Sequence, residues 1–570
     1  MPQISEPAAG VAASRRRTSS AEFFRGARRR VRAFLTRPHG ASPEIVVIAC
    51  VAISAGFAVM CIHLGTKAFW VDESIAVLPA RSIHFTGLPR SPFDLNYMSH
   101  QLEDGLWDPS APLYRYSVAA FTAVAGFDEW TTRGWSVLMG LALLAPCFLL
   151  FRRLYGETTA WIAIAILATL PSFAEHCREA RHFTFVLLMM YTTFWLVVRA
   201  TGKDGLRARA WWPLALTATV LGHYVGYMVV PIVAVYLLAS WPRPFLTARY
   251  AALYVALFVG YAALQAKYWN TLPFFHSIGC HNRHPGCEPS PFYYFGTILE
   301  FLGGGSRFWE TIAGTDPFLM LPNLGPVVLL MVGGIVLTIL DAGRGRWRAG
   351  HVLVLAAFWI PLILLSTQEL KFPRYMFYIL PVMCLFVARA VVAVSGARRL
   401  GPARRPVLAA AFLLVLVGPE IVKRSDGYDV STSLETRFGR HVQRMLDDDS
   451  ADTWQRTLAQ VDYLKQHMIP GDIVTTSFDD ASLGYYLGQF VHGFLNNEHD
   501  DEYFLGLLQE AKARGRRVHF IDMLPEQNYC HTKGVEVFSI DCRQKYPQFY
   551  AACHPRSPAH DSSCVRQYFR

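Results

Sequence analysis

The chain has 570 residues, of which 52% are hydrophobic and only 17% are charged. Soluble domains have about 25% charged residues, so a plain soluble enzyme is excluded, and the lack of low-complexity tracts and short repeats excludes a disordered or fibrous chain. The net charge of +11 does not indicate nucleic-acid binding, because most basic residues lie between apolar runs, where such charges set membrane orientation.

The first 43 residues are rich in arginine and show no signal-peptide pattern. We expect them to form a disordered, basic cytoplasmic tail that keeps the N-terminus inside.

Long apolar runs then follow one another from residue 44 to residue 418. They predict a mainly α, polytopic transmembrane helix bundle of about eleven spans, with the N-terminus inside and the C-terminus outside, because every proposed inner loop carries an arginine cluster. Two long outer loops are expected over 65–133 and 269–321. The expected spans are 45–64, 134–150, 160–173, 183–198, 211–222, 227–238, 250–268, 326–340, 351–366, 375–394 and 406–417.

The cysteines fall into two groups. Those in or beside the spans are expected to be free, namely Cys50, Cys61, Cys147, Cys177 and Cys384. The other six lie in predicted outer segments and indicate an oxidising compartment, with one disulfide in the second outer loop and two in the tail. These are Cys280, Cys287, Cys530, Cys542, Cys553 and Cys564. The alternative for the loop pair is a zinc site that includes His281 and His284, although the spacing matches no zinc module well.

From residue 419 to residue 570 the chain is polar and charged. Alternating elements predict a small extracytoplasmic α/β domain of roughly 100 residues with a cysteine-rich tail. Helices are expected over 453–468 and 501–514, a turn over 470–472, and strands over 473–477 and 517–522. The domain has neither a glycine-rich phosphate loop nor a nucleophile elbow, and the acidic run 496–502 is interpreted as a solvated loop rather than a cation site.

The first outer loop opens on two adjacent carboxylates, Asp72 and Glu73, which aromatic residues flank at the membrane interface. A carboxylate partly withdrawn from water there can act as a general base. The alternative is a helix that begins at this point with Asp72 as its N-cap. Asp108, later in the same loop, is a further candidate, and Pro112 after it is typical of the first residue of a helix.

A dense charged cluster precedes the span 183–198 and contains Glu179 and Arg181. It indicates either a cationic phosphate site, for which arginine is the best suited residue, or simple anchoring at the surface. His223 and Tyr224, in the tight hairpin, are a weaker candidate pair with an ordinary interfacial alternative.

A second basic cluster precedes the span 375–394 and contains Lys371, Arg374 and Tyr375. Two cations and an aromatic ring at the outer interface are suited to a lipid phosphate. The alternative is a set of snorkelling side chains that flank the end of a helix.

The order of these motifs resembles that of the GT-C glycosyltransferases of the protein O-mannosyltransferase and aminoarabinose-transferase type. The resemblance covers residues 45–417 and is carried by the segments 69–82 (FWVDESIAVLPARS), 111–116 (APLYRY), 152–156 (RRLYG), 177–188 (CREARHFTFVLL) and 371–381 (KFPRYMFYILP). Relatives often have His-Pro-Pro before Leu-Tyr, whereas this chain has Ser110-Ala111-Pro112. No role of that histidine therefore carries over.

The resemblance implies an enzyme that moves a sugar from a polyprenyl-phosphate carrier to an extracytoplasmic acceptor hydroxyl, with inversion at the anomeric carbon. It assigns the base to Asp72 or Glu73, and the lipid-phosphate site to Arg181, Lys371 and Arg374. The leaving group is a phosphate monoester with no diphosphate to chelate, so we predict that no metal or other cofactor is required. Loss of activity in a chelator that a divalent cation restores would contradict this.

The expected partners are the lipid-linked donor, the lipid bilayer of the inner (plasma) membrane, and an acceptor that is a protein, a glycan or a lipid; no nucleic acid is expected.

The main alternative function is a transporter or flippase for a lipid-linked or anionic substrate. That class places polar residues near the bilayer midplane and shows two similar halves. Here the charges lie at the outer interface and no repeat is visible. A binding protein that the bundle merely anchors is disfavoured, because eleven spans exceed what an anchor needs.

Overall fold

The structure is a computed structural model that describes part of the chain. The described residues are 40–89, 111–201, 206–240, 326–344, 348–366, 373–395, 403–417, 419–426, 429–436, 461–462, 464–476, 480–488, 491–493, 509, 513–516, 518–522 and 564–568. The predictions for the N-terminal tail, the span 250–268, the loop 269–321, Asp108 and Lys371 lie outside these residues. The same holds for the side chains of the six cysteines expected in disulfides.

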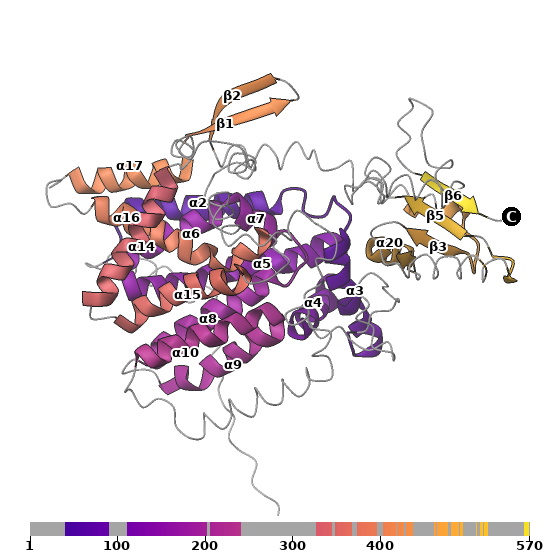
Figure 1. The fold of residues 1–570 in the computed structure, drawn as a ribbon, viewed down its shortest axis with the longest axis horizontal. Coiled ribbons are helices and arrows are strands. Elements are labelled where there is room, and N and C mark those ends of the chain that lie inside the picture. The colour runs from indigo at the N-terminus through magenta and orange to yellow at the C-terminus, as the bar shows by residue number, and fades with distance from the viewer. Residues whose placement is uncertain are drawn as a thin grey trace, which may run out of the picture.

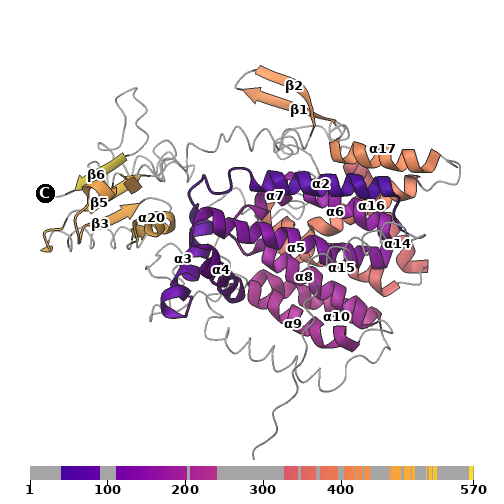
Figure 2. The ribbon, with the colours of Figure 1, turned by 180° about the vertical axis from the view of Figure 1, so that it is seen from behind.

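Most described helices pack side by side into one bundle (Figures 1 and 2). Two short 3₁₀ helices, η2 (Tyr224–Met228) and η6 (Pro373–Ile379), lead into α10 and α16. The helices of the bundle are α2 (Pro43–Cys61), α5 (Glu129–Tyr155), α6 (Glu157–Thr169), α7 (Pro171–Cys177), α8 (Phe183–Ala200), α9 (Leu206–Gly222), α10 (Val229–Ala239), α14 (Pro326–Arg344), α15 (Arg348–Ser366), α16 (Leu380–Ser395) and α17 (Arg404–Val417).

Within the described residues, four helical segments are long and apolar enough to cross a membrane: Pro43–Cys61, Glu129–Tyr155, Phe183–Ala200 and Tyr375–Ser395. Helices α6 and α7 form a fifth candidate together, although they are bent by 66°. Shorter apolar helices occupy four more of the expected spans. The predicted class, a mostly helical membrane bundle, is therefore confirmed, while the number of eleven spans stays a prediction.

The span expected over 160–173 is wrong as a single straight helix. Helix α6 ends at Thr169 and α7 starts at Pro171, with a 66° bend between them. The ring of Pro171 removes a backbone donor and clashes with the preceding turn, which interrupts the helix at this point.

The bundle is closely packed. An added Cβ at Gly334 of α14 would clash with the carbonyl oxygen of Phe386 on α16, so the two helices approach to backbone contact only because position 334 lacks a side chain. The five cysteines expected to be free are free, and three of them, Cys147, Cys177 and Cys384, are buried in this core.

The described residues of the first expected outer loop include α3 (Val71–Thr86), α4 (Pro112–Ala125) and the start of α5. Helices α3 and α4 contact each other and lie at the end of the bundle nearest to the C-terminal sheet (Figure 1). Pro112 is the first residue of α4, as predicted. Helix α5 begins earlier than expected, at Glu129, because the side chain of Asp128 caps it by accepting a hydrogen bond from Thr131 N at 2.7 Å.

The described part after residue 418 contains two sheets. Strands β1 (Pro419–Asp426) and β2 (Asp429–Thr436) form an antiparallel hairpin that was not expected from the sequence. The second sheet has the order β4-β3-β5-β6, with β3 parallel to β4 and β5, and β6 antiparallel to β5. Its strands are β3 (Ile473–Thr476), β4 (Val491–Gly493), β5 (Val518–Asp522) and β6 (Cys564–Tyr568). The strands predicted over 473–477 and 517–522 are β3 and β5.

Helix α20 (Asp480–Leu487) links β3 to the parallel strand β4, as a parallel pair requires a crossover. One of its sides packs on Val461, Leu464 and Val474 of the C-terminal part. Its tyrosines pack against Phe69 and Val77 of the first outer segment. Within the described residues, α20 thus joins the C-terminal part to α3.

Candidate active site

The adjacent carboxylates lie in the first turn of α3, where the positive end of the helix dipole stabilises negative charge. Trp70, not Asp72, is the N-cap residue, so the alternative role of Asp72 as the cap is wrong. The Glu73 carboxylate accepts a hydrogen bond from Trp70 N at 3.3 Å, which supports the helix start.

Glu73 is 1% exposed, and donors surround both of its oxygens. Arg133 of α5 donates to it in a bidentate manner, with Nε 2.9 Å from Oε1 and Nη2 2.7 Å from Oε2. The backbone N–H of Ala180 donates to Oε1 at 2.8 Å. Arg133 also donates to three backbone carbonyls, those of Leu64, Lys67 and Ala68. This buried pair therefore ties the start of α3 to α5 and to the segment before α8.

Asp72, one position earlier, has a different neighbour. Its carboxylate lies 3.0 Å from Nη1 of Arg181, and its side chain keeps 15% of its surface exposed. The Arg181 guanidinium lies 4.5 Å from the ring centre of Phe183 and 5.3 Å from that of Trp70, so aromatic faces confine it. Glu179 lies 3.8 Å from the same nitrogen of Arg181. Three predicted residues from two distant clusters thus meet at one place.

Two histidines adjoin this arrangement. The ring of His182 stacks on that of His223 with 3.4 Å between the ring centres and 4° between the planes. His223 Nδ1 accepts a hydrogen bond from Val225 N at 3.2 Å, which turns the chain into η2. His223 was predicted from the sequence; His182 stood in the same charged segment as Arg181 without being singled out.

The late basic cluster leads into η6, which lies against α7 and α8. Phe377 of η6 packs on Phe173, His176 and Phe183, with ring centres 5.8, 5.0 and 6.1 Å apart. Tyr375 is partly buried at the start of this element, and Arg374 belongs to it by its backbone. The structure therefore brings the element that carries Arg374 beside the segment that carries Arg181.

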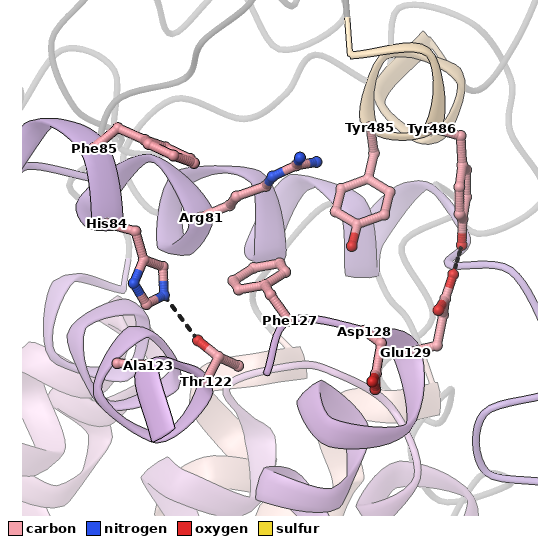
Figure 3. Close-up of a pocket in the computed structure, with 10 residues that line it drawn as sticks. All are labelled: Arg81, His84, Phe85, Thr122, Ala123, Phe127, Asp128, Glu129, Tyr485 and Tyr486. Atoms are coloured by element: carbon pink, nitrogen blue, oxygen red, sulfur yellow. Dashed lines mark hydrogen bonds between the residues drawn. The ribbon is translucent and has the colours of Figure 1, made fainter. Parts of the chain in front are cut away.

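A separate pocket of about 580 Å³ lies between α3, α4, the start of α5 and α20 (Figure 3). The Arg81 guanidinium lies 5.4 Å from the ring centre of Tyr485, and His84 Nε2 lies 3.0 Å from Thr122 Oγ1. The described residues that line it are Arg81, His84, Phe85, Thr122, Ala123, Phe127, Asp128, Glu129, Tyr485 and Tyr486. It is an aromatic pocket with charges of both signs, and Asp72 and Arg181 do not line it.

No group of three or more His, Cys, Asp or Glu side chains in the described part of the chain is arranged to hold a metal ion. The Arg181 guanidinium beside Asp72 is suited to an anionic ligand. That no metal is needed stays a prediction.

One part of the chain is similar to a known protein family. Residues 109–269 match the family model described as dolichyl-phosphate-mannose-protein mannosyltransferase. This stretch contains Arg133, Glu179, Arg181 and His223. No curated protein matches the sequence.

Solved structures extend the comparison to most of the chain. ArnT from Cupriavidus metallidurans in the apo state is 15% identical and has a TM-score of 0.55, over 84% of this chain and 92% of that one. ArnT bound to undecaprenyl phosphate has a TM-score of 0.54 at 13% identity over the same shares. Archaeoglobus fulgidus AglB, an oligosaccharyltransferase in complex with an inhibitory peptide and a dolichol-phosphate, has a TM-score of 0.51 at 13% identity, over 88% of this chain and 72% of that one.

ArnT and AglB are both GT-C glycosyltransferases, so these findings confirm the resemblance that the sequence motifs indicated. The fold of the chain is similar to the folds of ArnT and AglB, and its residues 109–269 match the family model of dolichyl-phosphate-mannose-protein mannosyltransferase.

Proposed function

We propose that the chain is an inverting glycosyltransferase that moves a sugar from a polyprenyl-phosphate carrier to an acceptor hydroxyl on the outer side of the membrane. The observation that carries the proposal is the pair of Asp72 and Arg181 at 3.0 Å, which combines a partly exposed carboxylate with a cation suited to phosphate. The undecaprenyl phosphate in the ArnT complex and the dolichol-phosphate in the AglB complex support a carrier of this chemical class.

Asp72 is the better candidate for the base. The oxygens of Glu73 already accept from Arg133, Ala180 and Trp70, and the side chain is buried, so an acceptor hydroxyl has no access to it. The carboxylate of Asp72 keeps exposed surface. Asp108 remains a further candidate from the sequence.

In the proposed reaction, Asp72 accepts the proton of the acceptor hydroxyl while the hydroxyl oxygen attacks the anomeric carbon from the face opposite the phosphate. The bond between the anomeric carbon and the phosphate oxygen breaks, and its electron pair leaves with the lipid phosphate. The proton stays on Asp72, and the configuration inverts. Arg181, together with Lys371 and Arg374, neutralises the charge that develops on the phosphate.

The pair of Asp72 and Arg181 has a consequence for the order of binding. While the guanidinium pairs with Asp72, it occupies the carboxylate oxygen that lies 3.0 Å away. A donor phosphate that attracts Arg181 would release Asp72 for the acceptor proton, which favours binding of the donor before the acceptor. Glu179, His223 and Tyr375 are proposed to shape this donor site around the phosphate.

We further propose the arrangement of the whole chain. Residues 1–43 form the cytoplasmic tail, 44–418 the bundle that holds the polyprenyl chain, and 419–570 an extracytoplasmic domain that helps to select the acceptor. The aromatic pocket between α20, α3, α4 and the start of α5 supports the proposed role in acceptor selection. Aromatic faces beside charged groups are suited to a sugar-bearing or polar acceptor.

The proposal is tested by transfer from a panel of radiolabelled polyprenyl-phosphate sugars to protein, glycan and lipid acceptors, with purified full-length protein. We expect Asp72→Asn to lower kcat by about 100-fold or more, because general base catalysis contributes that much. Asp341→Asn is the matched control: Asp341 also forms an ion pair with an arginine, Arg389, but between α14 and α16. The activity of Asp341→Asn is expected to stay within about twofold of the wild type, because the substitution lies away from the candidate site.

Wild-type turnover in a folded Asp72→Asn protein would contradict the assignment of the base and move it to Glu73 or Asp108. Tight binding of the lipid-linked sugars without transfer to any acceptor would contradict the enzyme itself and favour the transporter alternative.

A further inference from the structure

Helix α20 makes a polar contact with the start of the candidate site. The Tyr486 hydroxyl accepts a hydrogen bond from the backbone N–H of Phe69 at 2.7 Å and donates one to Glu129 Oε1 at 2.6 Å. Figure 3 shows the second of these bonds. One hydroxyl group thus joins α20, the residues before α3 and the first residue of α5.

The surroundings of this hydroxyl make the contact well defined. Phe69 is fully buried, and its ring meets that of Tyr485 edge to face with 5.1 Å between the centres. The Arg133 guanidinium also contacts the Phe69 ring and lies 5.1 Å from its centre. A second polar contact lies close by, between the buried hydroxyls of Ser74 on α3 and Ser482 on α20 at 3.0 Å.

The protonation state of Tyr486 suits its two bonds. Burial raises the pKa of the Tyr486 hydroxyl above its ordinary value, and the hydrogen bond to the Glu129 carboxylate raises it further. The group therefore keeps its proton at physiological pH. A neutral hydroxyl donates to the carboxylate and accepts from the backbone N–H at the same time, whereas a phenylalanine ring can do neither.

Phe69 lies three residues before Asp72, and the residue between it and the helix is Trp70, the N-cap of α3 that also faces Arg181. Fixing the Phe69 backbone therefore fixes where α3 begins and where its first turn points. We propose that Tyr486 is a positioning residue, through which docking of the C-terminal domain holds Asp72 against Arg181. The inference rests on the proposed function of Asp72 and adds to it a residue from a different part of the chain.

The test compares Tyr486→Phe with Tyr236→Phe in the full-length protein reconstituted in lipid nanodiscs. Tyr236→Phe is the matched control, because it also removes a tyrosine hydroxyl that bonds a neighbour, Thr201 Oγ1 at 2.7 Å, but within the α8 and α10 region. Both variants keep the aromatic ring. Tyr486→Phe therefore still lines the aromatic pocket between α20 and α3. The readouts are hydrogen exchange of a peptide that contains the Phe69 amide, and the separate values of kcat and KM.

We expect Tyr486→Phe to speed exchange at Phe69 by about tenfold or more and to lower kcat by about tenfold, because small misplacements of a catalytic group cost rate. The donor KM should stay within about twofold, since the phosphate-binding cations are unchanged. Tyr236→Phe should alter neither readout. If the role of Tyr486 were purely structural, Tyr486→Phe would lower the amount of folded protein, and the remaining folded protein would have the kcat and KM of the wild type.

Three results would overturn the inference. Wild-type exchange at Phe69 in Tyr486→Phe would show that the hydroxyl does not hold this backbone. Faster exchange with unchanged kcat would show that the contact does not position Asp72. A raised donor KM with unchanged kcat would move the role of α20 to donor binding. If the wild type itself transfers no sugar, the proposed function fails, and the exchange measurement still decides whether Tyr486 fixes the start of α3.

Discussion

At the scale of single residues, two adjacent carboxylates have opposite environments. Consecutive residues of a helix point about 100° apart, because 3.6 residues make a turn. Glu73 therefore turns into the protein and meets Arg133, while Asp72 faces Arg181 and keeps exposed surface. The sequence shows two equivalent acids at an interface, and only the neighbours that the fold supplies distinguish a structural carboxylate from a candidate base.

This difference predicts the stability of two variants. Glu73→Gln should destabilise the protein by about 3–5 kcal/mol, because it leaves the Arg133 charge buried without its partner. Asp72→Asn should destabilise it less, because the Asp72 side chain keeps 15% of its surface exposed to water, against 2% for Glu73. The apparent melting temperature of the purified protein measures both. Equal losses in the two variants would contradict the assignment of Glu73 as the structural partner.

The raised pKa of Tyr486 predicts a pH dependence. A group whose folded pKa lies above its unfolded value of about 10 stabilises the folded state fully below that pH and loses the contribution as the pH rises further. The difference in melting temperature between the wild type and Tyr486→Phe should therefore be constant from about pH 6 to about pH 9 and shrink above about pH 10. A difference that changes within the lower range would show that another group titrates at the contact.

At the scale of elements, periodicity predicted where helices lie, but not how closely or in what shape they pack. Helix α5 is 27 residues long and starts with a cap that the apolar pattern did not show. The span expected over 160–173 is broken at Pro171, which the apolar run around it concealed. Helices α14 and α16 meet at Gly334, whose importance depends on a partner that is distant in the sequence.

This close approach predicts the effect of adding one methyl group. Gly334→Ala should lower the apparent melting temperature clearly, because its Cβ collides with the backbone of Phe386 and forces α14 away from α16. Gly343→Ala lies on the same helix with no atom within 4 Å of its Cβ, and should be neutral or slightly stabilising. A similar melting temperature for both variants would mean that the two helices pack less closely than the structure shows.

At the scale of the whole molecule, the fold is shared with ArnT and AglB at only 13–15% identity. Such similarity is retained because a membrane bundle requires apolar helices of sufficient length rather than particular residues. The C-terminal part is tied to the bundle through α20, so the two parts share a pocket and a hydrogen-bonded contact beside α3.

The proposed orientation can be tested in intact cells with a thiol reagent that does not cross membranes. Lys465→Cys, in the C-terminal part, should be labelled more than the same protein without the substitution, because this part is proposed to lie outside and the chain has free cysteines of its own. Gly343→Cys, near the proposed inner end of α14, should be labelled only after the membrane is opened. Both positions are exposed in the structure, so access to the reagent depends on the side of the membrane. Labelling of Gly343→Cys in intact cells above that of the unsubstituted protein would contradict the proposed topology.

The sequence by itself determined the class of this protein. Apolar runs separated by arginine clusters specify a membrane bundle, the start of α4 follows from Pro112, and β3 and β5 follow from local strand patterns. Those features depend on neighbouring residues, so they can be read along the chain. The tertiary structure alone decided the contacts at the site, because they join positions that are far apart: Glu73 and Arg133 are separated by 60 residues, and Phe69 and Tyr486 by 417. No local pattern encodes such pairs, since each depends on how distant elements pack together.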